Sequence, residues 1–198
     1  MSKETEQLLQ EGLPTTSQIS RELKRVRYNS GFGGMLRSTI GILITVAAVA
    51  VLIAVLLLPV LQIYGTSMAP TLNEGDIVAS VKGTKFKTGE IVAFYYNNKI
   101  LVKRVIANPG EWVDIDSDGN VYVNNQKLDE PYIPLKAYGE TNIELPYQVP
   151  DSRIFVMGDN RDVSIDSRNT SVGCVSDEQI VGKIVFRIWP LKQAGWIE

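Results

Sequence analysis

The feature that most constrains this chain is an uncharged apolar run in its first third. Residues 40–63, IGILITVAAVAVLIAVLLLPVLQI, contain no charged side chain. As an α-helix rising about 1.5 Å per residue, this run would extend roughly 36 Å, which exceeds the ~30 Å hydrocarbon core of a bilayer. We therefore expect one transmembrane helix at residues 38–63, with Pro59 tolerated in its last turns. A buried core helix is the alternative, and the length of the uncharged run argues against it.

Basic residues around the run predict its orientation. Only Lys82 lies within about 20 residues after the run, so the excess of positive charge precedes it. We expect residues 1–37 to be a cytoplasmic polar segment, flexible apart from a short helix near residues 18–26, and residues 64–198 to be extracytoplasmic. A cleavable signal peptide fits poorly, because the run and its leader are long and no A-x-A pattern follows. The basic residues that precede the run are Arg21, Lys24, Arg25, Arg27 and Arg37.

The remainder of the chain has the pattern of β-structure. Short runs rich in Val, Ile, Phe and Tyr alternate with Gly, Asn, Asp and Pro, and no long helical period follows the apolar run. We predict a mainly antiparallel β-sheet domain at residues 64–198, with a smaller inserted β subregion at about 112–150. The runs are IVAFYY, KILVKRVIA, WVDID, NVYVNN, RIFVMG and KIVFRIW.

Composition excludes several classes of site. The 20 basic and 22 acidic residues nearly balance, so nothing favours nucleic acid as a partner. The chain has no histidine, which excludes a Ser-His-Asp triad and histidine-containing zinc sites. Cys174 is the only cysteine, so neither an intramolecular disulfide nor an all-cysteine metal site can form. We expect no metal and no cofactor, and any catalytic base must be Lys, Asp, Glu, Tyr or the amino terminus.

The stretch DIDSDGN, which starts at Asp114, begins like an EF-hand loop. The twelfth position of such a loop supplies a bidentate Glu, but this chain has Asn125 there. Two β-like runs flank the stretch, so a hairpin that turns through residues 117–120 is the better interpretation.

Ser67 follows the apolar run among small residues, but common serine motifs fail around it. Pro70 replaces the lysine of S-x-x-K, although Lys87-Thr88-Gly89 matches the KTG companion motif. Ala69 replaces the second glycine of G-x-S-x-G. A nucleophilic Ser67 would therefore need a different base.

Lys103 is the candidate base. A free lysine has a pKa of about 10.4, so a base active near neutrality needs a drop of about 3 units through burial away from other cations. Strand alternation in ILVKRVI places Leu101, Lys103 and Val105 on one face and Arg104 on the other. An exposed strand lysine shows the same pattern, so Lys103 is a candidate only together with Ser67.

A third polar stretch, GDNRDVSIDSR at residues 158–168, directly follows an apolar run. If its later part is extended, Ser164, Asp166 and Arg168 share one face. An Asp-Arg pair beside a serine hydroxyl could fix a reactive lysine by hydrogen bonding without adding a net cation. The alternative is a charged surface loop.

These stretches resemble, in order, the signature boxes of bacterial type I signal peptidases (leader peptidases). A transmembrane anchor directly before the first box agrees with that family, and the likeness covers about residues 40–190. The four boxes are SMAPTL (67–72), GDIV (75–78), KRVIANPGE (103–111) and GDNRDVSIDSR (158–168), and the connecting segments VYVNNQKLDEPY (121–132) and FRIWP (186–190) are also similar.

The resemblance implies a role for each matched residue. Ser67 would be the nucleophile and Lys103 the general base, with Ser164 orienting Lys103. Asp166 and Arg168 would form a supporting pair. The backbone N–H of Ser67 would be one oxyanion donor. Some members use a serine hydroxyl two residues before the nucleophile as the second donor, but this chain has Gly65 there, so a backbone group or water is left for that role.

The resemblance also implies the substrate. The family cleaves after small residues in an A-x-A pattern, and its partners would be signal peptides of secretory preproteins, the lipid bilayer and nearby translocation machinery. Apolar residues would form shallow pockets that accept methyl-sized side chains. An extended substrate would pair with strand edges near Ser67 and Lys103. The residues expected to bind substrate are Ile63, Met68, Leu72, Leu101 and Val102.

Two alternatives remain open from the sequence. Another Ser-Lys protease on a similar β scaffold, such as a self-cleaving SOS repressor, would share the dyad, but the transmembrane run argues against a DNA-binding repressor. A membrane-anchored binding or assembly domain would leave Ser67 inert, and Ser67→Ala would then leave its function intact.

Overall fold

The computed structural model describes residues 14–83 and 85–197. The chain divides into two compact units, Met1–Ile53 and Ala54–Glu198. Residues 1–13 of the expected polar segment lie outside the described part.

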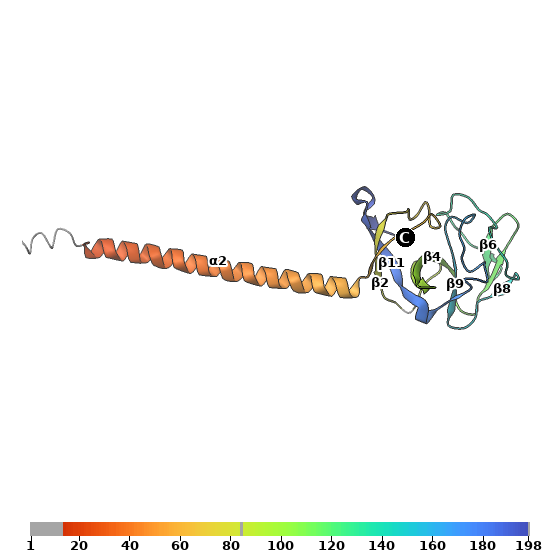
Figure 1. Ribbon diagram of the computed structural model, residues 1–198, viewed down its shortest axis with the longest axis horizontal. Helices are drawn as coiled ribbons and strands as arrows, with labels where there is room; N and C mark the ends of the chain where they lie inside the picture. Colours follow the sequence, from red (N-terminus) through yellow and green to blue (C-terminus); the bar gives the residue numbers. More distant parts are fainter. Residues whose placement is uncertain (1–13, 84, 198) are drawn as a thin grey trace, which may run out of the picture. The chain divides into compact units, whose positions relative to one another are not determined.

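The first unit contains most of one continuous helix, α2, which spans Thr16–Leu57 (Figure 1). Its start follows from local capping, because the Thr15 N–H donates to Gln18 Oε1 over 2.9 Å, as in a capping box. The expectation of a short helix near 18–26 within a flexible segment is therefore corrected for the described residues. Good helix formers between Gln18 and Arg27 support the longer helix. The stretch Gly33–Leu52 is long and apolar enough to cross a membrane by length and composition.

The predicted helix end is also corrected. The span was expected at 38–63, but α2 ends at Leu57, and β1 follows at Val60–Gln62. Pro59 gives the reason, because a residue that precedes proline avoids the helical conformation. The Pro59 carbonyl oxygen accepts the N–H and the hydroxyl of Ser80 at 2.9 and 3.1 Å, and these bonds join the chain to the sheet.

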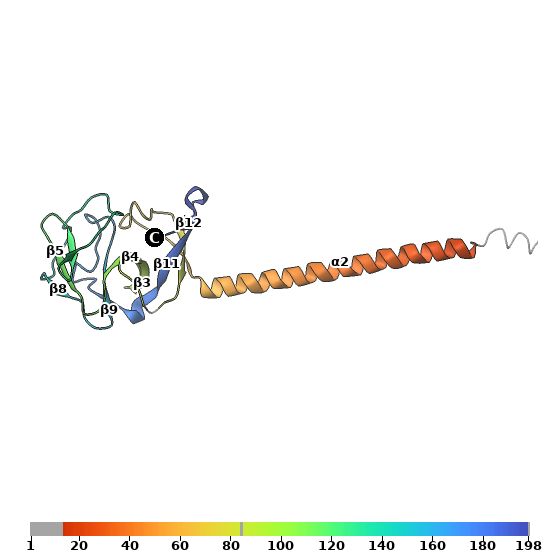
Figure 2. The same cartoon turned by 180° about the vertical axis from the view of Figure 1, so that it is seen from behind.

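The second unit is built from two antiparallel sheets, which confirms the prediction of a mainly antiparallel β domain. The larger sheet has the order β1-β2-β11-β3-β4-β9-β10, with β12 paired to β11, and the smaller has the order β7-β6-β5-β8. Both views show β9 between β4 and the smaller sheet (Figures 1 and 2). The remaining elements of the larger sheet are β2 (Ile77–Val81), β3 (Ile91–Tyr96), β4 (Lys99–Ala107), β9 (Arg153–Met157), β10 (Val175–Ser176), β11 (Ile180–Trp189) and β12 (Gly195–Trp196), with 3-10 turns η1 (Asp177–Gln179) and η2 (Leu191–Gln193).

The smaller sheet falls inside the subregion expected at 112–150. Its strands β5 and β6 pair antiparallel, which confirms the predicted hairpin. Asp116 Oδ1 closes the turn by accepting the N–H groups of Asp118 and Asn120 at 3.0 and 2.8 Å. The strands are β5 (Trp112–Ile115), β6 (Val121–Val123), β7 (Gln126–Lys127) and β8 (Tyr147–Gln148).

A hydrophobic cluster underlies the loop that carries Ser67. Buried side chains from this loop meet side chains from β2, β3 and β11, so the loop rests on the sheet instead of extending into solvent. The cluster contains Ile63, Met68, Leu72, Val78, Ile91, Ala93 and Ile184.

Candidate active site

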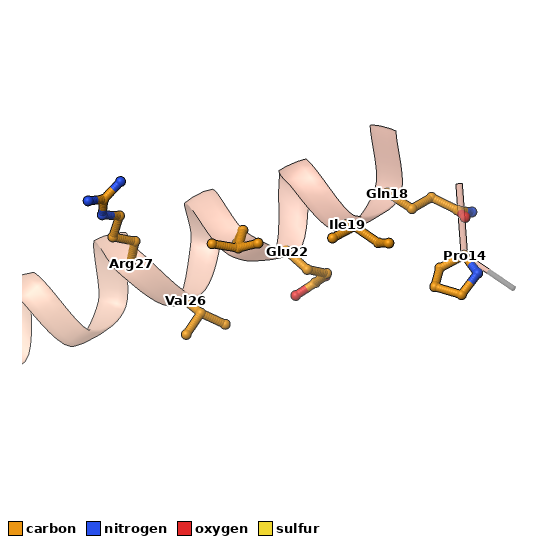
Figure 3. Close-up of a pocket in the computed structure, with 7 residues that line it drawn as sticks. Pro14, Gln18, Ile19, Glu22, Val26 and Arg27 are labelled. Atoms are coloured by element: carbon orange, nitrogen blue, oxygen red, sulfur yellow. The ribbon is translucent and has the colours of Figure 1, made fainter. Parts of the chain in front are cut away.

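A groove of about 790 Å³ runs along β1 and the first half of β4, and Ser67 is one of its lining residues. A second hollow, of about 620 Å³, lies on α2 between Pro14 and Arg27 and holds none of the candidate catalytic residues (Figure 3). The groove is therefore the candidate active site. It is lined by Val60, Leu61, Gln62, Ile63, Tyr64, Gly65, Ser67, Met68, Lys99, Ile100, Leu101 and Val102.

Ser67 and Lys103, which are distant in sequence, meet in the fold. Lys103 Nζ lies 2.6 Å from Ser67 Oγ and donates a hydrogen bond to it. Lys103 is 3% exposed, whereas Ser67 is partly exposed to the groove. Burial lowers the pKa of Lys103 to about 8, while the negative charge of Asp166 opposes this fall and the positive charge of Arg168 adds to it. The site thus pairs an accessible hydroxyl with a lysine that can be neutral at moderately alkaline pH.

Lys103 and Arg104 are adjacent in strand β4 but lie in different surroundings, as strand alternation predicts. Arg104 binds Asp159 through two hydrogen bonds, Nε to Oδ1 at 2.9 Å and Nη2 to Oδ2 at 2.7 Å. Both side chains are buried, with exposed fractions of 2% and 0%. Lys103 forms no ion pair within residues 14–83 and 85–197. Burial without a carboxylate partner is what lowers the pKa of a lysine.

The turn that contains Gly65 explains why this position lacks a side chain. Gly65 has a φ of +79°, a conformation that favours glycine. The same loop is closed by hydrogen bonds from the Ile63 N–H to the Asp76 carbonyl (2.8 Å) and from the Gly75 N–H to the Ile63 carbonyl (2.9 Å). No side chain at position 65 can therefore serve as a hydrogen-bond donor to the groove.

The turn after β9 approaches the nucleophile directly. The Asn160 N–H donates to the Ser67 carbonyl at 3.0 Å, and Asn160 Nδ2 donates to the Thr66 carbonyl at 3.3 Å. A Cβ at Gly158 would lie 2.5 Å from the Ser67 carbonyl oxygen and 2.3 Å from Ser164 Oγ. Only glycine permits this close approach.

Ser164, Asp166 and Arg168 come together, but not on an extended strand as expected. The Ser164 N–H donates to the Asn160 carbonyl at 3.1 Å, so the chain turns here. After this turn the segment folds back against β9. Asp166 and Arg168 form a fully buried pair, with Nε–Oδ1 at 2.9 Å and Nη2–Oδ2 at 3.0 Å. Asp166 Oδ2 also accepts the Gly158 N–H at 2.9 Å. The charged-surface-loop alternative is therefore wrong.

The expected bond from Ser164 to Lys103 is not formed. Ser164 Oγ is buried and has no hydrogen-bond partner among the residues that the structure describes, although Arg168 Nη2 donates to the Ser164 carbonyl at 3.2 Å. The hydroxyl lies close to Gly158. Its expected role toward Lys103 stays a prediction.

The expected substrate-binding residues divide into two groups. Ile63, Met68, Leu101 and Val102 line the groove. Leu72 does not, and its assignment is corrected: it is 0% exposed because the hydrogen bond from its N–H to the Met68 carbonyl, at 2.9 Å, turns it into the cluster under the loop.

Sequence reasoning missed several polar residues that support the site. Asp159, Asn160 and Arg161 lie inside the quoted box GDNRDVSIDSR, and that box was the available signal for them. Thr71 donates to Asp159 Oδ2 at 2.5 Å, and Glu130 pairs with Arg161. Both residues also lie inside quoted stretches, Thr71 in SMAPTL and Glu130 in VYVNNQKLDEPY.

The chain is similar to several known proteins. The family profile described as signal peptidase, peptidase S26, matches residues 36–189. A signal peptidase IB of Staphylococcus aureus is 40% identical over 151 residues, which are 66% of this chain and 78% of the relative. A signal peptidase I of Bacillus amyloliquefaciens is 35% identical over 162 residues, 76% of this chain and 86% of the relative. The solved structure of a signal peptidase I from Enterococcus faecalis is 30% identical and covers 50% of this chain and 96% of its own, with a TM-score of 0.43.

The profile match spans most of the chain and includes Ser67, Lys103 and the whole 158–168 segment. This chain therefore belongs to the signal peptidase family, peptidase S26, and is a peptidase.

Proposed function

We propose that the chain is a membrane-anchored serine endopeptidase that removes N-terminal signal peptides from translocated preproteins, with Ser67 as nucleophile and Lys103 as general base. The observation that carries this proposal is the 2.6 Å contact between Lys103 Nζ and Ser67 Oγ beside the groove. The burial that lowers the pKa of Lys103 to about 8 supports it, because a base must be unprotonated before it acts.

The chemistry follows from this pair. Neutral Lys103 takes the Ser67 hydroxyl proton as Oγ attacks the scissile carbonyl, and the resulting ammonium returns a proton to the leaving amine. An acyl group then remains on Ser67 Oγ. Water then attacks the ester as Lys103 takes one of its protons, the bond between the acyl carbon and Oγ breaks, and Lys103 returns the proton to Ser67 Oγ, which regenerates the free serine.

Stabilisation of the oxyanion rests on the backbone. The Ser67 N–H is one donor in this proposal. Gly65 contributes no side chain, so the second donor is another backbone group or a water molecule. The positive φ of Gly65 favours glycine, so position 65 presents no side chain to this wall of the groove.

The substrate binds as an added strand in this proposal. Residues Ile100–Val102 of β4 pair with β3 on one side, whereas β9 pairs with β4 only from Arg104 onward. The other edge of this stretch is unpaired within the described residues, and β1 ends the larger sheet across the groove. Unpaired edges bind extended peptides by β-augmentation. Apolar walls that include Ile63 and Val102 favour small side chains, as in A-x-A sites.

The membrane span determines where cleavage occurs. We propose that residues 1–37 are cytoplasmic, that a helix within 38–57 crosses the membrane, and that residues 64–198 are extracytoplasmic, near the translocation machinery. The five basic residues before the span support this orientation. A signal peptide in the same bilayer is confined near the groove, which raises its effective concentration.

Cleavage of a labelled preprotein by the full chain in detergent tests this function. We expect Ser67→Ala to abolish cleavage after an A-x-A site, whereas the matched control Ser171→Ala, at an exposed serine, keeps the wild-type rate. A second preprotein with a large residue before the cleaved bond should resist the wild-type enzyme. Full cleavage by Ser67→Ala would rule out the proposal and favour a binding domain with an inert Ser67.

A further inference from the structure

The segment Asp129–Tyr132 contacts the turn that supports the nucleophile. It belongs to the stretch 121–132, to which the proposed chemistry assigns no role. In the fold Glu130 pairs with Arg161 of the turn 158–161, and Tyr132 contacts Arg104, which binds Asp159 of the same turn.

Glu130 is the first contact. Its carboxylate pairs with the Arg161 guanidinium, and both side chains are 0% exposed. One bond joins Nη2 to Oε1, and a second joins Nη1 to Oε2 at 3.3 Å. Arg161 Nε also donates to the Gly158 carbonyl at 3.0 Å. Glu130 therefore holds the arginine that closes the turn.

Tyr132 is the second contact. The Arg104 guanidinium carbon lies 3.9 Å from the centroid of the Tyr132 ring, within cation–π distance. Arg104 in turn binds Asp159 in the same turn. The Tyr132 hydroxyl donates to Glu130 Oε1 at 3.2 Å, which joins the two contacts into one network.

The turn 158–161 connects this network to Ser67. The Asn160 N–H binds the Ser67 carbonyl, and Gly158 packs against the same oxygen. Displacement of the turn by a few tenths of an ångström would therefore change the position of Ser67 relative to Lys103, which β4 fixes separately.

We propose that Glu130 and Tyr132 are positioning residues that hold the turn 158–161 against the nucleophile loop and so set the contact between Ser67 and Lys103. This inference rests on the proposed function of that pair. Loss of the Glu130 charge leaves Arg161 buried without its counterion, and the turn then relaxes and admits water beside Lys103.

Kinetics of the full chain in detergent, measured across pH, test the proposal. We expect Glu130→Gln to lower kcat at least tenfold with KM changed less than threefold. The acid limb of kcat/KM should move to higher pH, because hydration returns the pKa of Lys103 toward its ordinary value. The charged groups that act on Lys103, namely Asp166, Arg168 and Asp159, are unchanged in this variant. The matched control Asp129→Asn removes a neighbouring exposed charge and should keep the wild-type kinetics.

Tyr132→Phe keeps the experiment decisive if Glu130→Gln folds poorly, because it removes only the hydroxyl and retains the ring over Arg104. It should shift the acid limb in the same direction by a smaller amount, and Glu130→Asp should recover part of the lost kcat. A merely structural role predicts a reduced folded fraction, measured by circular dichroism, with an unchanged acid limb, and that result would overturn the proposal. The outcome is separable from the proposed function, because Ser67→Ala tests that function independently.

Discussion

The adjacent cations Lys103 and Arg104 of strand β4 lie on opposite faces of the strand and in different electrostatic environments. On one face Lys103 is buried against the neutral hydroxyl of Ser67, at 2.6 Å. On the other face Arg104 is equally buried but is held by both oxygens of Asp159 and by the Tyr132 ring. Among the described residues, Lys103 is thus desolvated without an ion-pair partner, whereas Arg104 is desolvated and its charge is neutralised by Asp159.

The difference shows how one strand can carry a catalytic group and a structural group side by side. Burial is the main cause that lowers the pKa of Lys103 to about 8, so the side chain can exchange a proton. A guanidinium stays charged at any ordinary pH, and its bidentate geometry suits a permanent buried pair. Each substitution of Lys103 or Arg104 below alters one face and leaves the other intact.

The largest effect is expected from removal of the base. Lys103→Ala should lower the initial rate of preprotein cleavage by about 10²- to 10⁴-fold. Lys103→Arg should be as inactive, because an arginine cannot release its proton near neutral pH. The control Lys127→Ala removes an exposed lysine and should be fully active. Activity of Lys103→Arg near the wild-type rate would show that the face of β4 toward Ser67 carries no base.

A large loss of stability is expected on the other face. Arg104→Met leaves Asp159 buried without its partner, so unfolding of the full chain by urea in detergent should require about 3–5 kcal/mol less free energy. Arg25→Met should change this value by less than about 1 kcal/mol, because Arg25 and Glu22 form an exposed pair. An equally small effect of Arg104→Met would contradict the assignment of a structural role.

Substitution of Lys103 should have the opposite effect on stability. The folded pKa, about 8, is below the unfolded value of 10.5, so the unfolded state binds more protons between these values and wild-type stability rises with pH there. Lys103→Met should therefore stabilise the chain at pH 7 by about 1–3 kcal/mol. This advantage should disappear above about pH 10.5, as urea titrations at several pH values can measure. A variant less stable than wild type at pH 7 would refute a desolvated lysine.

The pH dependence of the wild-type enzyme tests Lys103 without any substitution. Because only neutral Lys103 accepts the Ser67 proton, kcat/KM should rise about tenfold per pH unit up to about pH 8 and then level off. Steady-state cleavage between pH 5 and 10 measures this limb. A rate that stays constant down to about pH 5 would exclude a lysine base.

Prediction from sequence succeeded where a local pattern carries the information. The uncharged run predicts an apolar helix, and alternating β-branched residues predict the antiparallel sheets and the β5–β6 hairpin. It failed where a tertiary contact competes with the local pattern. Pro59 and the bonds to Ser80 end the helix early, and the turn at Met68 buries Leu72 away from the groove.

The sequence by itself determined that a catalytic serine here must work without histidine, and that Ser67 and Lys103 stand in boxes that resemble those of one peptidase family. Only the tertiary structure decided that these residues meet at 2.6 Å, that Lys103 is buried with no carboxylate partner in the described part of the chain, and that Arg104 is paired. The physical reason is that a pKa depends on solvent exclusion and on nearby charges, and segments distant in sequence supply both.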